Sequence, residues 1–526
     1  MTIDLHPWRA LKAKAEAATR RRGRLLDLLT HPALRGPRWP LYALFPAIRL
    51  AVAHYICRNG HVTRARRELG TARPAGAHRM AARLDAMLAV IADGHPAAPP
   101  SRVPGRPAAN GSENGPVLMA LSSSLPFHQA GYARRSDALL RALRTLGVTA
   151  HAATRPNFPA DRPAYRLGLV TPAYRLGLVA GDGTAEPGGV VYQHLSAPGV
   201  AINRSPDDAY IAAYAEALAK LAEESGAAVL HAHSNFINGL AAAQAGRRLG
   251  LPVVYEVRGL WFLTQAAEDP EFAGSELARY QQAMEMAALG ACDAVVAIAA
   301  CLRDELVRLG VPPGKIHVMP NAVDPALFEP APRDAALARE LGMEGRTVVG
   351  FAGSLNGYEG VDRLIDAVTA LAADGLDLGL VVAGGGPAAA ALRRRARRSG
   401  GRIVFTGPVA FARMRALYSV FDICPLPRRD LPVCRAVPPM KALEIMAMAK
   451  PLIVSALPPL LEFGEEGVSR LSCPPDDTAA LAAALRRLAL DAAERERLGR
   501  AARAWVVDHR AWDGIAKRYR NLYQSL

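Results

Sequence analysis

The sequence has few of the features that mark secreted and metal-binding proteins. It holds six cysteines in 526 residues, scattered along the chain, and no two of them form a CxxC pair. Most lie in apolar surroundings, which predicts reduced, buried thiols in a cytoplasmic protein. Ligands at such spacings do not favour a zinc site, so no metal is expected from them.

Long hydrophobic runs are also missing near the N-terminus. The first thirty residues are polar and Arg-rich, unlike a secretory signal. The most apolar run, Leu41–Cys57, is interrupted by Pro46, Arg49 and His54. It is too short and too broken to cross a bilayer. We expect a protein that is soluble or lies on a surface.

Acidic residues are scarce in the first fifth of the chain. Residues 1–106 carry 19 Lys and Arg against 6 Asp and Glu, so +13 of the net charge of +16 lies there. Residues 8–29 and 81–92 have helical spacing. A basic amphipathic helix of this kind can lie on an anionic membrane, and a solvated face of an accessory domain is the other interpretation. Aromatic residues are too few among the basic ones to favour nucleic acid as a partner.

The rest of the chain has the composition of a globular protein with two or three domains, since 51% of all residues are hydrophobic. Residues 96–115 are rich in Pro, Gly, Ser and Asn, which predicts a linker after a basic helical extension at 1–95. Beyond the linker the order strand, loop, helix recurs, as in a doubly wound α/β sheet. We therefore predict an α/β fold behind a helical N-terminal extension.

Glycine-containing loops follow several of the predicted strands. Such loops are expected at 353–357, at 384–386 and at 406–407, each between an apolar run and a helical pattern. Small residues at a strand end allow the backbone to approach a phosphate closely. Repetition at successive strand ends indicates a ligand-binding edge more strongly than one loop would.

The most informative stretch runs over residues 428–462. It follows a strand-like run, Tyr418–Leu426, and continues into an amphipathic segment, Lys441–Ala449, and a buried-strand pattern, Pro451–Ser455. Glu444 is therefore expected near the start of a helix at the carboxyl edge of a parallel sheet, where open α/β sheets bind ligands.

Three segments of the chain resemble a known family. Residues 438–455, PPMKALEIMAMAKPLIVS, resemble the donor-sugar motif of the family 4 retaining glycosyltransferases, which have the GT-B fold. Residues 320–324, PNAVD, resemble the family's run between its two domains, with Ala322 in place of Gly. The run YEVRG-W at 255–261 is similar to a subgroup associated with exopolysaccharide and exosortase gene sets. The resemblance extends over residues 117–520.

The resemblance implies a GT-B architecture, in which two Rossmann-like doubly wound domains face a cleft. The expected divisions are an acceptor domain at 116–322, a nucleotide-sugar domain at 323–505 and a C-terminal helix at 506–526 that returns to the first domain.

The implied activity is that of a retaining, nucleotide-sugar-dependent glycosyltransferase of the hexosyltransferase type. Its partners would be a nucleotide-sugar donor and a lipid-linked or glycan acceptor, in exopolysaccharide or cell-envelope glycan synthesis. It would be cytoplasmic, or peripheral at the inner face of the cytoplasmic membrane, where residues 1–95 could meet anionic lipid. The nucleotide sugar is a substrate, and neither a cofactor nor a metal is expected. The alternative is a non-catalytic GT-B scaffold that binds membrane or a partner through its basic N-terminal segment.

On the donor side, charge neutralisation for a leaving diphosphate and a grip on the nucleoside are required. By resemblance, Glu444 binds the ribose, and Arg428 and Lys441 are the expected catalytic cations. The expected donor-binding residues are Gly353, Ser354, Gly384, Gly385, Arg429 and Glu444. Lys441 lies one helical turn before Glu444, so the two can face one site; a surface ion pair between them is the alternative.

On the acceptor side, the expected residues are His128, Gly131, Arg134 and Arg258. Arg258 contacts the acceptor or a phosphate, or forms a structural ion pair with Glu256. A strand-end histidine resembles the family's residue beside the transferred sugar. Strand alternation is expected to turn one histidine of the pair His231 and His233 into the core, which favours His233 as the catalytic residue.

Besides Ala322, two positions depart from the family pattern. Many relatives have a Lys where this chain has Glu359, and a carboxylate pointing into the site would repel a diphosphate. The family's second Glu, eight residues before Glu444, is Ala436 here. Either the loop is rearranged and Arg435 or Lys441 takes over, which we favour, or activity has been lost.

Overall fold

The computed structural model describes residues 46–70, 76–95, 115–161, 184–185, 190–399 and 402–526. The predicted basic helix at 8–29 and nearly all of the predicted linker lie outside the described residues. The chain divides into two compact units, which are described separately.

The first unit contains the described N-terminal helices together with two later segments, 198–213 and 271–285. Its helices are α3 (Pro46–Arg58), α4 (Val62–Leu69) and α5 (Ala77–Asp93), and α5 confirms the helix predicted at 81–92. Polar contacts hold the segments together. The Thr63 amide donates to Glu276 at 2.7 Å, and the Tyr280 hydroxyl donates to Asp207 at 2.8 Å. Helix α4 is therefore bound to a distant part of the chain, and so is α5, because Arg83 donates to Asp207 at 3.4 Å.

The second unit begins with an eight-stranded sheet in the order β3-β4-β2-β1-β5-β6-β7-β8. All neighbouring strands are parallel except β3 and β4. The strands are β1 (Val117–Leu121), β2 (Ala150–Thr154), β3 (Thr184–Ala185), β4 (Tyr192–His194), β5 (Val229–His233), β6 (Val253–Val257), β7 (Ala294–Ala297) and β8 (Ile316–Val318). The connecting helices are α6 (Gly131–Thr145), α9 (Asp207–Glu224), α10 (Phe236–Leu249), α11 (Trp261–Glu268), α12 (Glu276–Ala291) and α13 (Ala300–Arg308).

Further along the chain, two three-stranded parallel sheets have the orders β11-β10-β9 and β12-β13-β14. A bridge between Val349 and Ile423 joins them at β9, and one hydrophobic core covers both. The strands are β9 (Thr347–Ala352), β10 (Leu378–Ala383), β11 (Ile403–Gly407), β12 (Cys424–Leu426), β13 (Leu452–Ser455) and β14 (Leu471–Cys473). The helices include α14 (Ala335–Glu340), α15 (Val361–Ala373), α16 (Ala389–Ala396), α17 (Met414–Val420), α18 (Pro432–Ala436), α19 (Lys441–Ala447), α20 (Pro458–Leu461) and α21 (Thr478–Leu490).

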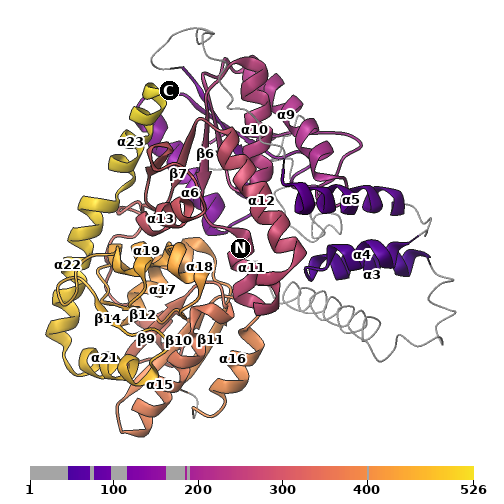
Figure 1. The fold of residues 1–526 in the computed structure, drawn as a ribbon. Helices are drawn as coiled ribbons and strands as arrows, with labels where there is room; N and C mark the ends of the chain where they lie inside the picture. Colours follow the sequence, from indigo (N-terminus) through magenta and orange to yellow (C-terminus); the bar gives the residue numbers. More distant parts are fainter. Residues whose placement is uncertain (1–45, 71–75, 96–114, 162–183, 186–189, 400–401) are drawn as a thin grey trace, which may run out of the picture. The chain divides into compact units, whose positions relative to one another are not determined.

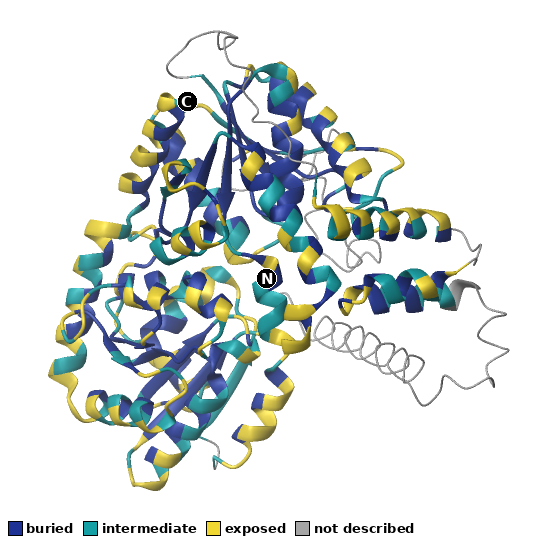
Figure 2. Ribbon diagram, in the orientation of Figure 1, coloured by how far each residue is buried: buried dark blue, intermediate teal, exposed yellow. Residues whose placement is uncertain are grey.

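The central strands are buried on both faces, as expected for parallel sheets covered by helices. β1, β5, β6 and β10 have every residue buried, and Figure 2 shows strands enclosed by helices with exposed outer faces. Two Rossmann-like halves of this kind confirm the predicted doubly wound α/β class.

The C-terminal helices connect the two sheets. In Figure 1, α22 (Ala492–Arg510) runs beside the second sheet and α23 (Trp512–Ser525) beside the first. Helix α23 packs on α6 and contributes Trp512, Ile515, Tyr519 and Leu522 to the core of the first sheet. The last helix is therefore a packing element of the N-terminal half.

One predicted strand is present only in part. The prediction of a strand over Tyr418–Leu426 is wrong in its first part, because residues 418–420 end helix α17 and the strand β12 begins only at Cys424. All six cysteines are thiols, and five of them are buried. Within the described residues, no helix combines the length and apolar composition that crossing a bilayer requires.

Candidate functional site

Two glycine loops meet at the carboxyl ends of β9 and β10. A Cβ atom on Gly384 would lie 1.8 Å from the carbonyl oxygen of Gly353, so only glycine allows this contact. The Leu355 amide donates to the Gly385 carbonyl at 3.0 Å, which ties the loops together. Ser354 and Gly385 are exposed. The structure thus brings together the four loop residues predicted to bind the donor.

Lys441 lies over this loop. A Cβ atom on Gly353 would stand 2.7 Å from Lys441 Nζ, and the ammonium lies 4.4 Å from the ring centre of Phe351. Nζ donates to Glu359 Oε2 at 2.7 Å. The alternative of a surface ion pair between Lys441 and Glu444 is therefore wrong, since the partner is Glu359 and the pair is largely buried.

The other predicted donor-side cations also have internal partners. Arg428 binds Glu359 through two nitrogens, at 2.9 and 3.3 Å, and donates to the Val437 carbonyl at 2.8 Å. Arg429 donates to Asp362 at 2.5 Å and to the Gly357 carbonyl at 3.0 Å. Glu359 does point inward, which the sequence analysis considered, but its carboxylate is bound there by the cations of Arg428 and Lys441.

These ion pairs set the protonation states. Burial alone would raise the pKa of the Glu359 carboxyl, but Arg428 and Lys441 outweigh it and lower that pKa to about 2. Burial lowers the pKa of Lys441, and Glu359 opposes that shift. The pKa of Arg428 is raised, because the attraction of Glu359 exceeds the cost of burial. Glu359 is therefore a carboxylate, and it helps to keep Lys441 charged.

Glu444 occupies the first turn of α19, as predicted. Its Oε2 accepts a hydrogen bond of 2.7 Å from the Tyr418 hydroxyl. Burial raises the pKa of this carboxyl, and the hydrogen bond from Tyr418 partly offsets the shift. Glu444 lines a pocket of about 280 Å³ together with Arg134, Phe411 and Met440. The carboxylate thus has one anchored oxygen and faces an open volume.

The acceptor-side residues lie around the start of α6. Gly131 is exposed at the first position of the helix, and a Cβ atom there would lie 3.4 Å from Met440 Sδ. The Arg134 guanidinium stacks over the Phe411 ring at 3.5 Å, and His128 Nδ1 lies 2.8 Å from Ser123 Oγ. Gly131 and Arg134 are therefore close to α19 and its loop, whereas Arg258 belongs to a different cluster.

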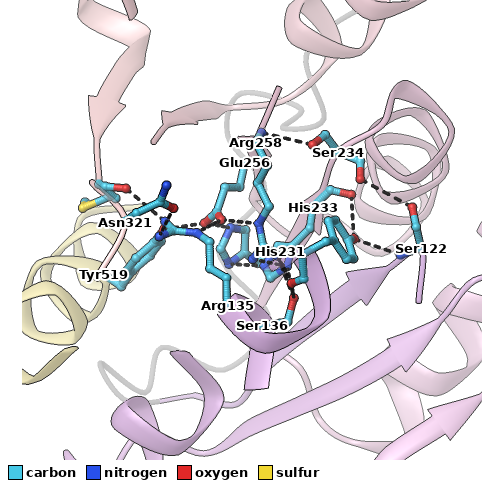
Figure 3. Close-up of polar contacts among 12 residues, drawn as sticks. Ser122, Arg135, Ser136, His231, His233, Ser234, Glu256, Arg258, Asn321 and Tyr519 are labelled. Atoms are coloured by element: carbon cyan, nitrogen blue, oxygen red, sulfur yellow. Dashed lines mark hydrogen bonds and ion pairs between the residues drawn. The ribbon is translucent and has the colours of Figure 1, made fainter. Parts of the chain in front are cut away.

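That cluster is a buried network centred on Glu256, at the end of β6 (Figure 3). Glu256 Oε1 accepts hydrogen bonds from Arg135 at 2.9 Å and from Arg258 at 2.6 Å. Tyr519, on the last helix, donates to the other oxygen. Arg135 also donates to the Met319 and Pro320 carbonyls and to the Asn321 side chain, at 3.0 to 3.2 Å. The predicted alternative of an Arg258–Glu256 ion pair is confirmed.

Both histidines of β5 belong to the same network. Each is fully buried, and their ring centres are 4.4 Å apart. The alternation argument that placed one of them in the core and the other outside is wrong, because residues two apart on a strand point to the same face. Arg258 donates to His233 Nδ1 at 2.7 Å, so this nitrogen is an acceptor and the ring proton sits on Nε2. The contact of His233 with a transferred sugar stays a prediction.

The charge around these histidines disfavours protonation. Burial and then Arg258 lower the pKa of His233 well below its usual value, and burial also lowers the pKa of His231. His231, His233 and Glu256 bring three potential metal-ligand atoms within 4.8 Å of one another. However, Glu256 is already bound by two guanidinium groups, and their positive charge opposes a cation. We assign no metal to this cluster.

Sequence reasoning missed Arg135, Tyr519, Tyr418 and the two cation partners of Glu359. Arg135 had a detectable signal, because it shares the buried stripe of α6 with Leu139 and Leu143 at helical spacing. A charged residue on a core-facing stripe requires a buried partner. Tyr519 and Tyr418 gave no comparable signal, because their partners are distant in sequence.

Ala436, the residue at the position of the family's second Glu, ends helix α18. Ala436 is buried at the end of α18, where its carbonyl accepts a weak hydrogen bond from the Cys301 thiol at 3.5 Å. Arg435 is exposed and pairs with Asp430 at 2.5 Å. Of the two residues considered as substitutes, Lys441 and not Arg435 therefore reaches the glycine loops.

Two family models match successive parts of the chain. Residues 130–327 match the model described as Glycosyltransferase Family 4, and residues 346–491 match the model described as Glycosyl transferases group 1. A D-inositol 3-phosphate glycosyltransferase of Stackebrandtia nassauensis is 30% identical over 296 residues, which is 54% of this chain and 64% of that protein. D-inositol 3-phosphate glycosyltransferase 1 of Catenulispora acidiphila is 36% identical over 30% of this chain and 37% of its own length. The aligned part thus spans less than two thirds of these relatives.

Solved structures share the architecture at low sequence identity. Sucrose-phosphate synthase from Thermosynechococcus elongatus has a TM-score of 0.62 and 20% identity, covering 78% of this chain and 98% of that one. HepE from Anabaena, in complex with UDP and glucose, has a TM-score of 0.59 and 16% identity, covering 78% of this chain and 99% of its own. At these identities the likeness establishes the fold, and it agrees with the GT-B prediction.

The two matched segments follow the order of the two Rossmann-like halves of the structure, and the run 320–324 lies between the last strand of the first half, β8, and the first strand of the second, β9. This chain therefore has the GT-B fold, and its two halves match, in order, a model described as Glycosyltransferase Family 4 and one described as Glycosyl transferases group 1.

Proposed function

We propose that the protein is a glycosyltransferase that moves a sugar from a nucleotide-sugar donor to a lipid-linked or polysaccharide acceptor with retention, in exopolysaccharide or cell-envelope glycan synthesis. The observation that carries the proposal is the position of Lys441 and Glu444 on one helix. The first lies over the joined glycine loops, and the second faces a pocket one turn later. An ammonium suits a diphosphate, and a carboxylate suits the hydroxyls of a ribose.

The similar proteins support the donor class. The Stackebrandtia relative is named as a glycosyltransferase, and HepE was solved with UDP and with UDP-glucose. We propose that the basic N-terminal segment brings the protein to an anionic membrane surface, where a lipid-linked acceptor is found.

The first experiment is thermal unfolding of the full chain with UDP, GDP, ADP and their sugars. A ligand that binds only the folded state raises the unfolding temperature, by an amount equivalent to about 2.7 kcal/mol at a hundred times its Kd. We expect one nucleotide to stabilise the protein, and Glu444→Gln to remove the effect. Glu496→Gln on α22, which removes the same charge from an exposed pair with Arg500, is the matched control.

Transfer itself is measured with the donor so identified and an undecaprenyl-type lipid acceptor in anionic vesicles, and the anomeric configuration of the product is read by NMR. An inverted product would contradict retention. Changing Arg20, Arg21, Arg22 and Arg24 together to Gln should weaken vesicle binding, and so should added salt. Unchanged vesicle binding would refute the membrane role.

A non-catalytic scaffold is the second candidate, and two observations favour it. Arg428 and Arg429, both predicted to meet the donor, are bound to Glu359 and Asp362. Ala436 also lacks the carboxylate that the family pattern has at its position. A scaffold would show neither nucleotide-dependent stabilisation nor turnover, yet would still bind vesicles. Nucleotide stabilisation that is lost in Glu444→Gln, together with transfer, would exclude it.

A further inference from the structure

Three charged side chains form a closed cluster beside the glycine loops. Glu359 is 3% exposed, and it is bound by Arg428 on one side and Lys441 on the other. Arg428 is itself 7% exposed, and only 12% of the Lys441 side chain is open. One negative and two positive charges therefore share a site from which water is largely excluded.

The two cations are used differently. Arg428 donates to both carboxylate oxygens of Glu359, and its third nitrogen donates to the Val437 carbonyl. An ammonium has three N–H donors. Among the residues that the structure describes, Glu359 is the only hydrogen-bond partner of the Lys441 ammonium. Two donors of Lys441 are thus available beside Gly353, whereas Arg428 has its donors directed inward.

The net charge of the cluster also distinguishes Lys441 from Arg428. The bidentate ion pair of Arg428 with Glu359 is neutral as a unit, so the net charge of +1 resides on Lys441. The ammonium is held in place by the hydrogen bond to Glu359 and by the face of Phe351. Gly353 leaves the space that Nζ occupies, because a Cβ atom there would be 2.7 Å away.

We propose that Glu359 is a positioning residue, which together with Arg428 holds the Lys441 ammonium over Gly353 so that Lys441, and not Arg428, binds the diphosphate of the donor. This inference rests on the proposed function for the identity of the ligand. It assigns a use to Glu359, at the position where many relatives have a lysine. The carboxylate does not compete with the diphosphate, because Arg428 cancels its charge.

The opposite reading is that Glu359 occupies the diphosphate site and must leave it. The two roles of Glu359, as a positioning residue or as a competitor of the diphosphate, predict different effects on the charge of Lys441. Burial lowers the pKa of Lys441, and Glu359 is the largest of the effects that raise it. Without the carboxylate, a buried ammonium beside Arg428 would lose its proton or its position. Removing Glu359 should therefore weaken anion binding, although the site gains one positive charge.

The test measures the Kd of inorganic diphosphate by calorimetry, with the full-length protein, for Glu359→Gln and for Asp366→Asn. Asp366, on α15, forms an exposed ion pair with Arg395 on α16, so each variant removes one negative charge, at positions seven residues apart in the chain. We expect Glu359→Gln to weaken binding roughly tenfold or more at pH 8 and to recover part of it at pH 6, as Lys441 regains its proton. Asp366→Asn should bind as the unchanged protein does.

Tighter binding by Glu359→Gln would overturn the inference in favour of a competing carboxylate, and equal binding would overturn it as well. A second measurement uses the unchanged protein, in case the variant fails to fold. Reductive methylation followed by mass spectrometry should show that diphosphate protects Lys441, and absence of protection would contradict the inference.

The same experiments separate this inference from the proposed function. A protein that binds diphosphate through Lys441 yet transfers no sugar refutes the enzyme and leaves the role of Glu359 intact. A protein that transfers sugar while Glu359→Gln binds diphosphate unchanged refutes only the role of Glu359.

Discussion

Two buried carboxylates in this protein each bind two cations, and they do so at equivalent places, near the carboxyl ends of parallel strands. Glu256 holds Arg135 and Arg258 in the first half, and Glu359 holds Arg428 and Lys441 in the second. The local composition is the same, one acid and two bases. The two clusters differ in how many N–H donors of the basic side chains are left without a partner inside the cluster once the ion pairs have formed.

In the first half the N–H donors of Arg135 and Arg258 bind acceptors inside the protein. Arg135 reaches the carbonyls of residues 319 and 320, Asn321 and Tyr519, and Arg258 reaches Tyr132, Ser136 and His233 (Figure 3). The network joins α6, β6, the run between the two halves and the last helix. In the second half an ammonium replaces one guanidinium and retains donors beside a glycine loop. A buried acid whose two bases are both saturated is a structural joint, as at Glu256, and we propose that the cluster at Glu359 binds a ligand because one of its bases is not saturated.

The largest expected effect is on the structural joint. Glu256→Gln leaves two buried guanidinium groups without a counter-charge, and we expect it to lower the free energy of unfolding by about 3 to 5 kcal/mol. Urea denaturation measures this change. Glu305→Gln, which breaks an exposed pair with Arg308, should cost less than about 1 kcal/mol. Equal effects of the two variants would contradict the assignment.

The second prediction concerns acid. The folded-state pKa of Glu359 is about 2, below the value of about 4.3 in an unfolded chain. Its contribution to stability is therefore complete above about pH 4.3 and is lost as the pH falls through about 2. Between these limits we expect the unchanged protein to lose roughly 3 kcal/mol that Glu359→Gln does not lose. Urea denaturation from pH 5 to pH 2 tests this, and parallel pH curves would contradict it.

The third prediction concerns the ligand side of the comparison. Lys441→Met should reduce kcat/KM for the donor by roughly 10- to 100-fold, or about 1.4 to 2.7 kcal/mol, because one diphosphate contact is lost. Stability should change much less than in Glu256→Gln, since Arg428 still neutralises Glu359. Steady-state kinetics and urea denaturation of the same sample provide both numbers. A large loss of stability with unchanged kinetics would make Lys441 a structural residue.

The smallest effect is expected at the last helix. Tyr519→Phe removes one hydroxyl that donates to Glu256 and accepts from Arg135, and both partners keep other ion pairs. We expect a loss of about 1 kcal/mol in unfolding free energy. Donor binding should stay unchanged, because Tyr519 lies in the structural joint. A change in donor Kd would show that the two clusters are coupled.

The sequence alone determined the class of fold and the order of its parts. Strand, glycine loop and helix patterns are local, so they identified both doubly wound halves, the loops at 353–357 and 384–386, and Glu444 in the first turn of a helix. The strand pattern Pro451–Ser455 became β13 with one residue fewer. The run Tyr418–Leu426 misled because buried residues at the end of a helix and in a short strand have the same apolar composition.

Only the tertiary structure decided which charged side chains meet. An ion pair between Lys441 and Glu444, three residues apart, was the alternative to a shared site, and Lys441 instead pairs with Glu359, 82 residues away. Arg135 and Tyr519 meet across 384 residues. Ion pairs of this kind form where the folded backbone places two charges in one water-poor space, and periodicity carries no information about such long-range partners. The spacing of His231 and His233, in contrast, did contain the answer, since a strand repeats every two residues.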